Sequence, residues 1–310
     1  MKPFFACGIM LCLSLALFGC EGLFGDRTSI REDYRTGTEG LHVAIDGARS
    51  LVVFEDERDI REDYWITVEN RGATALESED IFMSVAMPEG FLQTTDATRL
   101  TSLQQFNEIR TDILRGKDRY SLKGEKLSHI LTVTPSTPRP GATASIHADV
   151  CYRYETILSE TICIDPGQKG ACRRTSFSYP RGQGAPISIS NLEVSLRRDG
   201  TQVEPRLLIT IENVRQGVVT LPEEFINACT TRDNINKLEV VRVELGSETL
   251  HCTTQEGSVN MRDSIATISC SGRRMDSQDD VFHSPVIVEL AYGYHTSVSH
   301  SVGLRIQGGS

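Results

Sequence analysis

The chain has 310 residues, of which 39% are hydrophobic and 24% charged, with a formal net charge of −10 at pH 7. This composition is typical of a globular protein and excludes a disordered or collagen-like chain, and the length suffices for about two domains. The acidic charge argues against nucleic acid or anionic lipid as the main partner. Its ordinary role is to keep a protein soluble.

The first 20 residues predict export. Lys2 precedes FFACGIMLCLSLALFG, an apolar run that is short for a membrane span but suits the hydrophobic region of a signal peptide. The run ends at Leu17-Phe18-Gly19-Cys20, which resembles the lipobox of bacterial-type lipoproteins, although Phe18 departs from the usual small or aliphatic residue. The resemblance implies cleavage before Cys20 and lipidation of its thiol. An ordinary signal peptide or an uncleaved anchor is the alternative.

We therefore expect residues 1–20 to be a lipoprotein signal peptide. The mature protein would be anchored to a membrane through Cys20, on the extracytoplasmic side. Residues 21–40 are polar and glycine-rich without sustained periodicity, which predicts a flexible tether. No other apolar run is long enough to span a bilayer, so we expect the remaining chain to lie outside it.

Two stretches recur in the same order in the two halves of the chain. YWITVENRG at 64–72 returns as LLITIENVRQG at 207–217, and YRYETILSETICI at 152–164 returns as YGYHTSVSHSVGL at 292–304. Repetition at nearly one offset indicates a tandem duplication of a module of roughly 120–140 residues. We therefore predict a first module at 41–166, a linker at 167–186 and a second module at 187–310, each module with its own β-rich core.

The tyrosine-rich stretch predicts the last hairpin of each module. With strands at 150–155 and 159–164, Tyr152 faces Ile162 and the tyrosines lie toward the core. Cys151 and Cys163 then oppose each other on the other face. Both cysteines are absent from the second copy, which is the pattern of a bonded pair. Two independent buried cysteines remain the alternative.

The number of cysteines after residue 20 indicates that the protein is located in an oxidising compartment. Six cysteines lie outside the first 20 residues, and an even number in an exported protein predicts disulfides. Metal binding is the alternative, but the chain contains no C-x2-C pair and we predict no metal site. The predicted pairs are Cys151–Cys163, Cys252–Cys270 at the ends of two strand-like runs, and, by subtraction, Cys172–Cys229 across the module boundary.

Two segments interrupt the strand pattern. LTSLQQFNEIRTDILRG has apolar residues at helical spacing and a stop at Gly116, which predicts an amphipathic core helix in the first module. Pro222 opens PEEFINACT, which predicts a shorter helix in the second module. The apolar positions of the first helix are Leu100, Leu103, Phe106, Ile109 and Ile113.

Short alternating strands with regular turn signals predict a mainly β fold of two tandem Ig-like antiparallel β-sandwiches, with a short helix inserted in each. The ITVENRG strand with its turn and the tyrosine-rich final hairpin resemble the CARDB type, the adhesion-related Ig-like repeats of prokaryotic surface proteins. The resemblance implies surface exposure and a stalk, spacer or binding role. It carries over no catalytic residue.

The sequence shows no enzymatic motif. It contains no G-x-S-x-G, no H-E-x-x-H and no phosphate-binding G-x-x-x-x-G-K-[ST], so we predict no catalytic residues and no cofactor. His295 and His300 fall on opposite faces of the predicted hairpin and cannot share a metal there. Asp276, Asp279 and Asp280 are possible calcium ligands, but a solvated loop is the favoured interpretation and the question stays open.

The leading functional hypothesis is a non-catalytic spacer, adhesion or scaffold protein of the cell envelope, with a protein or glycan partner and no nucleic acid. The alternative is an accessory or ligand-binding subunit of a membrane transport or secretion complex. An exported hydrolase is disfavoured because no nucleophile–base pair is visible.

Cys20→Ala tests the attachment. Without the thiol no acyl chains can be added, and stable anchoring needs two or more of them. We expect the variant to leave the membrane fraction or to accumulate as an unprocessed precursor, as measured by cell fractionation and the mass of the N-terminus. Membrane-bound, normally processed Cys20→Ala protein contradicts the lipoprotein prediction.

Overall fold

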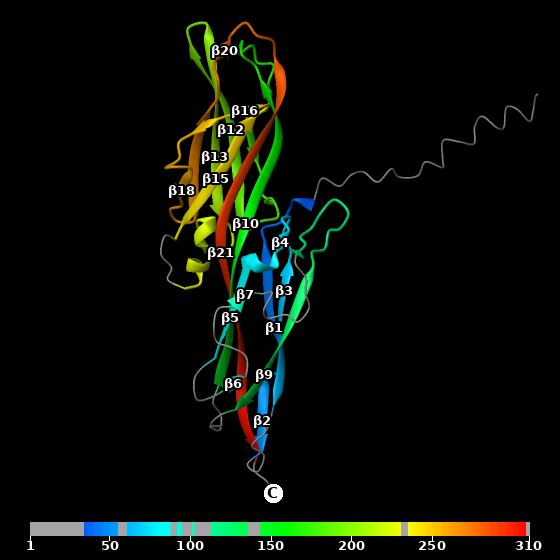
Figure 1. Cartoon of the computed structure of the whole chain (residues 1–310). Coiled ribbons are helices and arrows are strands. Elements are labelled where there is room, and N and C mark those ends of the chain that lie inside the picture. Colours follow the sequence, from blue (N-terminus) through cyan, green and yellow to red (C-terminus); the bar gives the residue numbers. More distant parts are fainter. Residues whose placement is uncertain are drawn as a thin grey trace, which may run out of the picture. The chain divides into compact units, whose positions relative to one another are not determined.

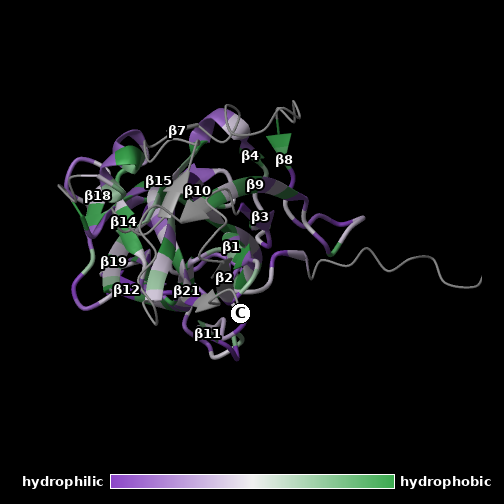
Figure 2. Ribbon diagram, turned by 90° about the horizontal axis from the view of Figure 1, so that it is seen from below, coloured by the Kyte–Doolittle hydropathy of each residue, from purple (hydrophilic) through white to green (hydrophobic). Residues whose placement is uncertain are grey.

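Antiparallel β-strands make up most of the described chain, which confirms the predicted mainly β class (Figure 1). The computed structural model describes residues 34–54, 61–87, 92–94, 101–102, 113–135, 143–230 and 235–307. The alternation of polar and apolar positions along the strands is visible in Figure 2. In β10, for example, Ile146, Ala148 and Val150 are fully buried at every second position.

The first half of the chain builds a four-stranded sheet. Its strand order is β1-β3-β9-β6. Leu41, Val43 and Ile45 of β1 and their neighbours Ile66 and Val68 of β3 are buried on one face. The strands are β1 (Leu41–Asp46), β3 (Glu62–Asn70), β9 (Lys126–Pro135) and β6 (Leu92–Thr94).

The second half builds a sheet with the same central pairings. β1 pairs antiparallel with β3 so that Leu41 opposes Asn70, and β12 pairs with β13 so that Ile187 opposes Asn213. The repeated ITVEN and ITIEN segments thus occupy equivalent strands. The order of this sheet is β11-β12-β13-β19-β17, and β20 also pairs with β13. The strands are β11 (Ser176–Ser178), β12 (Ile187–Asp199), β13 (Gln202–Asn213), β19 (Ile265–Ser271), β17 (His251–Cys252) and β20 (Met275–Asp276).

A third sheet contains strands from both halves. Its order is β16-β15-β21-β10-β5-β7, and at its centre the long strands β10 and β21 lie side by side (Figure 1). These strands are β16 (Glu248–Thr249), β15 (Lys237–Leu245), β21 (Phe282–Gln307), β10 (Thr143–Ile164), β5 (Ile81–Ala86) and β7 (Thr101–Ser102). β2 (Ser50–Phe54) and β14 (Val218–Thr220) pair with β21, and β18 (Ser258–Asn260) pairs with β15.

The pairing of β10 with β21 has local two-fold symmetry. Tyr152 opposes Tyr294 and Tyr154 opposes Tyr292, so the register is centred on Arg153 and Gly293. The pairing extends along the whole of β10, from Thr143 to Ile164. The two tyrosine-rich repeats are therefore each other's partners, which is the arrangement of a symmetric dimer interface inside one chain.

The predicted hairpin is wrong, because residues 156–158 lie inside the continuous strand β10. Tyr152 faces Tyr294 and not Ile162. Thr156, Ile157 and Leu158 lack the Gly, Asn or Asp that tight hairpin turns require, and Thr and Ile favour extended backbone. The shared sheet also runs across the expected boundary between 41–166 and 187–310, and residues from Tyr34 onward form one compact unit.

The segment expected to be a linker is partly built into the fold. Phe177 of β11 is buried, as are Gln183 and Ala185 just before β12. Gln183 Nε2 donates to the carbonyl of Ile189, and its Oε1 accepts the N–H of the same residue. These contacts fix residues 177–185 against the second half.

Short 3-10 helices replace regular helices in the described chain. η3 (Pro222–Ala228) begins at the predicted proline, and η2 (Ser78–Asp80) lies in the first half. The predicted helix at 100–116 is contradicted at both ends, because Thr101–Ser102 is β7 and Ile113–Leu114 is β8, which pairs with β4 (Leu76–Glu77). Leu103, Phe106 and Ile109 lie outside the described residues.

Gly293→Ala tests the crossing point of the two long strands. A Cβ on Gly293 would clash with Thr220 Oγ1 and with Cα of Phe225, so we expect a loss of about 1–3 kcal/mol of unfolding free energy from overpacking. Gly303→Ala on the same strand is the control, since its new Cβ would meet only Arg49 O, at 3.7 Å. Urea unfolding measures both; equal stability of the two variants contradicts the packing described here.

Candidate binding site

Four buried tyrosines mark the place where the two halves meet. Tyr152 and Tyr154 of β10 and Tyr292 and Tyr294 of β21 are each at most 2% exposed. Alternation along each strand puts all four on one face, and neighbouring ring centroids are 5.7 to 6.3 Å apart. Most of these contacts are edge-on or tilted, which aromatic pairs prefer. We call this group the tyrosine cluster.

The first tyrosine of each repeat holds the start of a strand. Tyr152 Oη accepts the N–H of Leu41 at 3.3 Å, and Tyr292 Oη accepts the N–H of Ile187 at 3.4 Å. Leu41 begins β1 and Ile187 begins β12, so the two bonds are equivalent. Thr156 Oγ1 lies 2.9 Å from Tyr292 Oη and satisfies the remaining hydroxyl capacity.

The second tyrosine of each repeat holds the turn after the repeated asparagine. Tyr154 Oη accepts the N–H of Thr74 at 3.3 Å, and Tyr294 Oη accepts the N–H of Gly217 at 2.9 Å. Each hydroxyl also donates, Tyr154 to the carbonyl of Gly184 and Tyr294 to Oδ1 of Asn213.

The asparagine of the repeated motif closes its own turn in both copies. Asn70 Nδ2 donates to the carbonyl of Thr74, and Asn213 Nδ2 donates to the carbonyl of Gly217, both at 2.7 Å. The sequence likeness of ITVEN and ITIEN thus has a physical cause, since each asparagine anchors a loop that a tyrosine then holds.

Burial raises the pKa of every tyrosine in the cluster, because the phenolate is disfavoured away from water. The pKa of Tyr294 rises to about 12, and those of Tyr152, Tyr154 and Tyr292 rise well above their usual value. The cluster therefore stays neutral over the physiological range and acts as structure, with its hydroxyls occupied by backbone groups.

One carboxylate joins loops from both halves at the edge of this cluster. Glu39 immediately precedes the strand region, and its oxygens lie 3.5 Å from Arg71 Nη1 and 3.0 Å from Arg215 Nη2. Arg71 follows Asn70 of the first half and Arg215 follows Asn213 of the second. His42 Nδ1 lies 3.6 Å from the same carboxylate. Glu39 therefore has an ionic contact in each half.

Backbone bonds hold the chain in front of Glu39. Gly37 donates its N–H to the carbonyl of Arg181 at 2.7 Å, and Gly184 donates to the carbonyl of Gly37 at 2.8 Å. Arg215 Nε donates to the carbonyl of Thr38 at 3.2 Å. The part of the expected tether that the structure describes is thus fixed against the junction of the two halves, unlike the prediction from composition.

A cleft of about 430 Å³ opens beside the tyrosine cluster. Its walls are the start of β1, the loop before β14 and the segment of β21 that follows Tyr294. Tyr152, Tyr294 and Pro186 also line it, and Glu39 with Arg215 forms an ion pair within its lining. A second cleft of about 320 Å³ shares these two charged residues and adds Arg71, Lys117 and Lys123. Both clefts offer charged hydrogen-bonding groups to a polar ligand.

Unpaired strand edges flank the first cleft. In the described part of the chain, β1 pairs only with β3, and β21 between Thr296 and Val302 pairs only with β10. Such edges expose backbone donors and acceptors that can bond to an extended segment of another polypeptide. The groups that the first cleft and its borders expose are backbone donors and acceptors and charged side chains.

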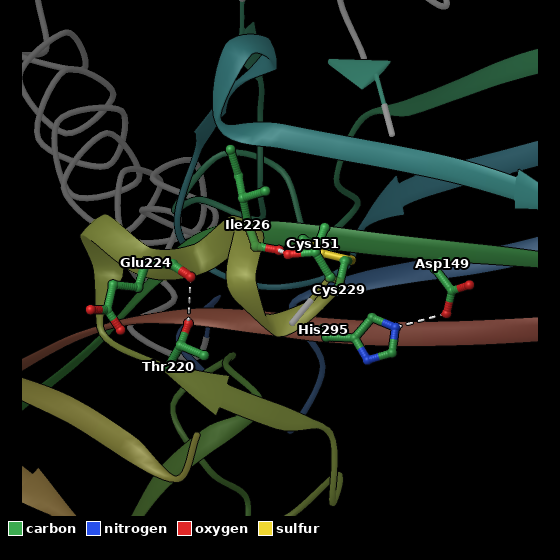
Figure 3. The surroundings of a disulfide bond; sticks show 8 residues. Asp149, Cys151, Thr220, Glu224, Ile226, Cys229 and His295 are labelled. Atoms are coloured by element: carbon green, nitrogen blue, oxygen red, sulfur yellow. Dashed lines mark hydrogen bonds and ion pairs between the residues drawn. A yellow bond between two sulfur atoms is a disulfide. The ribbon is translucent and has the colours of Figure 1, made fainter. Parts of the chain in front are cut away.

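The opposite face of the long strands carries a disulfide and η3 (Figure 3). Cys151 of β10 is bonded to Cys229, which directly follows η3. His295 lies beside them with Nε2 at 2.8 Å from Asp149 Oδ1, and it is only 8% exposed. Burial and the carboxylate hold this imidazole in place on the sheet, on the face opposite the tyrosines.

All six predicted cysteines are bonded, but only one predicted pair is confirmed. Cys252–Cys270 joins β17 to β19 as expected. The predicted pairs Cys151–Cys163 and Cys172–Cys229 are wrong: the structure has Cys151–Cys229 and Cys163–Cys172. Because β10 does not fold back, Cys151 and Cys163 lie about 40 Å apart along one extended strand.

The other residues singled out from sequence do not converge on a site. His300 Nε2 lies 3.3 Å from the carbonyl of Ala48, on the face of β21 opposite His295. Asp276 and Asp279 each accept a backbone N–H within their own loop, from Gln278 and Asp276. Among the described residues, no group of three or more His, Cys, Asp or Glu side chains could hold a metal ion. Cys20 lies outside the described residues.

Within the described residues, no helix is long and apolar enough to cross a membrane.

Sequence reasoning missed Glu39 and Arg215. The lack of periodicity in 21–40 predicts a tether that includes Glu39, and the ion pair depends on a contact between residues far apart in the chain. A signal did exist: an arginine follows the repeated asparagine by one residue in the first copy and by two in the second, at Arg71 and Arg215.

Tyr294→Phe tests the tyrosine cluster. Loss of the hydroxyl leaves Oδ1 of the buried Asn213 and the half-buried N–H of Gly217 without this partner, so we expect a cost of about 1–3 kcal/mol at pH 7. The raised pKa of Tyr294 gives stability that is complete below about pH 10, the unfolded value, and is lost as pH rises toward 12.

The Phe variant lacks this titration. Between pH 10 and pH 12 the unfolding free energy of the wild type should therefore fall by about 1.4 kcal/mol per pH unit more than that of the Phe variant. Urea unfolding at pH 7, 10 and 11 measures the difference, with Tyr120→Phe at an 87% exposed position as the control. Parallel pH profiles for wild type and Tyr294→Phe contradict the role given to this hydroxyl.

Comparison with known proteins gives no family. No protein-family model and no curated protein matches the sequence. Among solved structures, the secreted serine protease VesC from Vibrio cholerae is 11% identical over 79% of this chain, with a TM-score of 0.18. The chain spans about half of VesC, 49% of its length. The E. coli chaperone DraB is 10% identical over 74% of this chain and 87% of its own, also with a TM-score of 0.18. At these TM-scores neither likeness bears on the fold or the function of this protein.

Proposed function

We propose that this protein is a non-catalytic binding and scaffold protein of the cell envelope, anchored through lipid on Cys20. The observation that carries the proposal is the continuous β10–β21 pairing, which joins two repeats into one body that has binding clefts at its junction. A spacer or adhesion protein needs such a fixed body, because a hinge between modules would leave the binding surfaces without a defined orientation.

The disulfides support the location. Three bonds fix Cys151 to Cys229, Cys163 to Cys172 and Cys252 to Cys270. Disulfides persist in oxidising compartments and are rare in the cytosol, so they indicate an extracytoplasmic environment. Membrane attachment itself is inferred from the lipobox-like Leu17-Phe18-Gly19-Cys20.

The strand pairing supports an Ig-like origin. In each half a sheet of its own (β1-β3-β9 and β12-β13-β19) accompanies strands of the shared sheet (β5-β10 and β15-β21). We infer that each half is an Ig-like sandwich whose final strands cross into the common sheet. The equivalent bonds of Tyr154 and Tyr294 support descent of the two halves from one module.

The position of Glu39 favours a second candidate, an accessory subunit of a membrane complex. The described chain begins at Tyr34 and reaches the junction at Glu39, which lies with Arg215 in the lining of both clefts. A partner bound there would sit close to the point at which the chain enters the fold. A ligand-binding subunit of a transport or secretion complex fits this arrangement.

Mild crosslinking in cells followed by affinity purification separates the two candidates. We expect a scaffold or adhesion protein to yield several envelope partners, whereas one stoichiometric membrane partner supports the accessory subunit. Arg215→Ala should reduce crosslinking at the junction, and Arg197→Ala, an exposed arginine of β12, is the matched control. Recovery of the protein in the cytosolic fraction with reduced cysteines contradicts both candidates.

A further inference from the structure

Trp65 is the single tryptophan of the chain, and it lies on the outer face of a sheet. It is 46% exposed, while its neighbours in β3, Tyr64 and Ile66, are buried on the inner face. Ile130 of β9 stands directly opposite Trp65 and is 52% exposed. The two side chains form an apolar pair on a face whose other described side chains, apart from Ala44, are polar.

Carboxylates and hydroxyls surround this pair. Asp46 of β1 is the cross-strand neighbour of Trp65 on its other side. In the next row Thr132 Oγ1 donates to Asp63 Oδ1 at 2.7 Å, and Ser128 is exposed on the same face beyond Ile130. We call the surface formed by Asp46, Asp63, Trp65, Ser128, Ile130 and Thr132 the Trp65 face.

Local stability does not account for the exposed indole. A cross-strand pair of an aromatic and a β-branched residue contributes about 0.2–1 kcal/mol to a sheet. A threonine or tyrosine at position 65 would keep most of that contribution. Trp65 and Ile130 are not scattered singly but lie next to each other on one face, and tryptophan is enriched among the residues that carry affinity at binding surfaces.

We propose that the Trp65 face binds a neutral polysaccharide. A sugar ring has an apolar C–H face that can stack on the indole and on Ile130. The hydroxyls at its rim can donate to Asp46 and Asp63 and exchange hydrogen bonds with Ser128 and Thr132. Tryptophan combines a large apolar surface with one N–H donor, which suits a ligand of this mixed character.

Size and charge favour a glycan over other partners. Two exposed side chains are too small an apolar centre for a stable protein interface, which buries about 800 Å² on each partner. The carboxylates Asp46 and Asp63 repel phosphate, sulfate and uronate groups, and the six residues of the face include no basic side chain to offset them. The ligand is therefore a neutral glycan and neither an acidic one nor a lipid surface.

The inference rests on the proposed envelope role only in that glycans are met outside the cell. Its test does not depend on the lipid anchor or on the junction clefts. Failure of the glycan test would leave the crosslinking result intact, and failure of anchoring would leave glycan binding intact. The two proposals can thus be overturned separately.

The fluorescence of Trp65 provides a direct assay with the full chain. We expect at least one of cellohexaose, chitohexaose and maltohexaose to give a saturating change in tryptophan emission, because no other indole contributes. Heparin and polygalacturonate, which are anionic, should give no change. Absence of a saturating change with all three neutral oligosaccharides, or an equal response to the polyanions, overturns the proposal.

Variants locate the binding on the Trp65 face. Trp65→Thr keeps a β-forming residue and should abolish retention on the matching insoluble polysaccharide, whereas Trp65→Tyr should keep a reduced part of it. Asp46→Asn should weaken binding about tenfold, because the amide oxygen still accepts a hydrogen bond but lacks the charge that strengthens it. Val241→Ala, at a 46% exposed apolar position of β15, should bind like wild type.

Thermal unfolding by circular dichroism should show that Trp65→Thr remains folded. Normal retention of a folded Trp65→Thr protein overturns the proposal. If Trp65→Thr proves unstable, Asp46→Asn is the deciding variant, because Asp46 is exposed and its substitution should leave the fold intact. Unchanged glycan affinity of Asp46→Asn then overturns the proposal.

Discussion

The antiparallel pairing of β10 with β21 is the constraint on which the rest of the structure depends. The two strands come from the two repeats, and their register is centred on Arg153 and Gly293. Because the pairing runs along all of β10, neither half can complete its part of the shared sheet without the other. Loop closure between such distant segments is costly in entropy. This entropy cost is offset by a continuous ladder of backbone hydrogen bonds and by the apolar surface that the two halves bury together.

The tyrosine cluster follows directly from this register. The register places Tyr152 opposite Tyr294 and Tyr154 opposite Tyr292, so the four hydroxyls lie close together. Each hydroxyl accepts a hydrogen bond from a backbone N–H of a neighbouring strand or loop. Their raised pKa values follow from the burial of the hydroxyls, which disfavours the charged phenolate. On the other face, the Cys151–Cys229 bond fastens η3 of the second half to β10 of the first. Hydrogen bonds, aromatic packing and a disulfide thus all stabilise the region where β10 and β21 pair around Arg153 and Gly293.

The two candidate binding surfaces arise in different ways. The first junction cleft lies between the unpaired edges of two sheets, and both clefts are lined by Glu39 and Arg215 from distant parts of the chain. The Trp65 face belongs to one sheet and needs only strand alternation, which places Trp65, Asp63 and their neighbours outward. A fixed body carrying both surfaces can hold a polypeptide at one and a glycan at the other, as expected of an envelope scaffold.

Residue type, alternation and short separations are enough to predict the β class, the repeat, the bonding of the six cysteines after Cys20 and the local Cys252–Cys270 pair. The sequence also marked Pro222 as the start of a helical turn. The partners of Cys151 and Cys163, the role of Glu39 and the sharing of a sheet were decided only by tertiary structure. A hairpin and an exchanged pairing of two repeats use the same alternation of buried residues, so the pattern of the tyrosine stretch fits both. What separates them is whether residues 156–158 turn or stay extended, and long-range pairing with β21 settles that question.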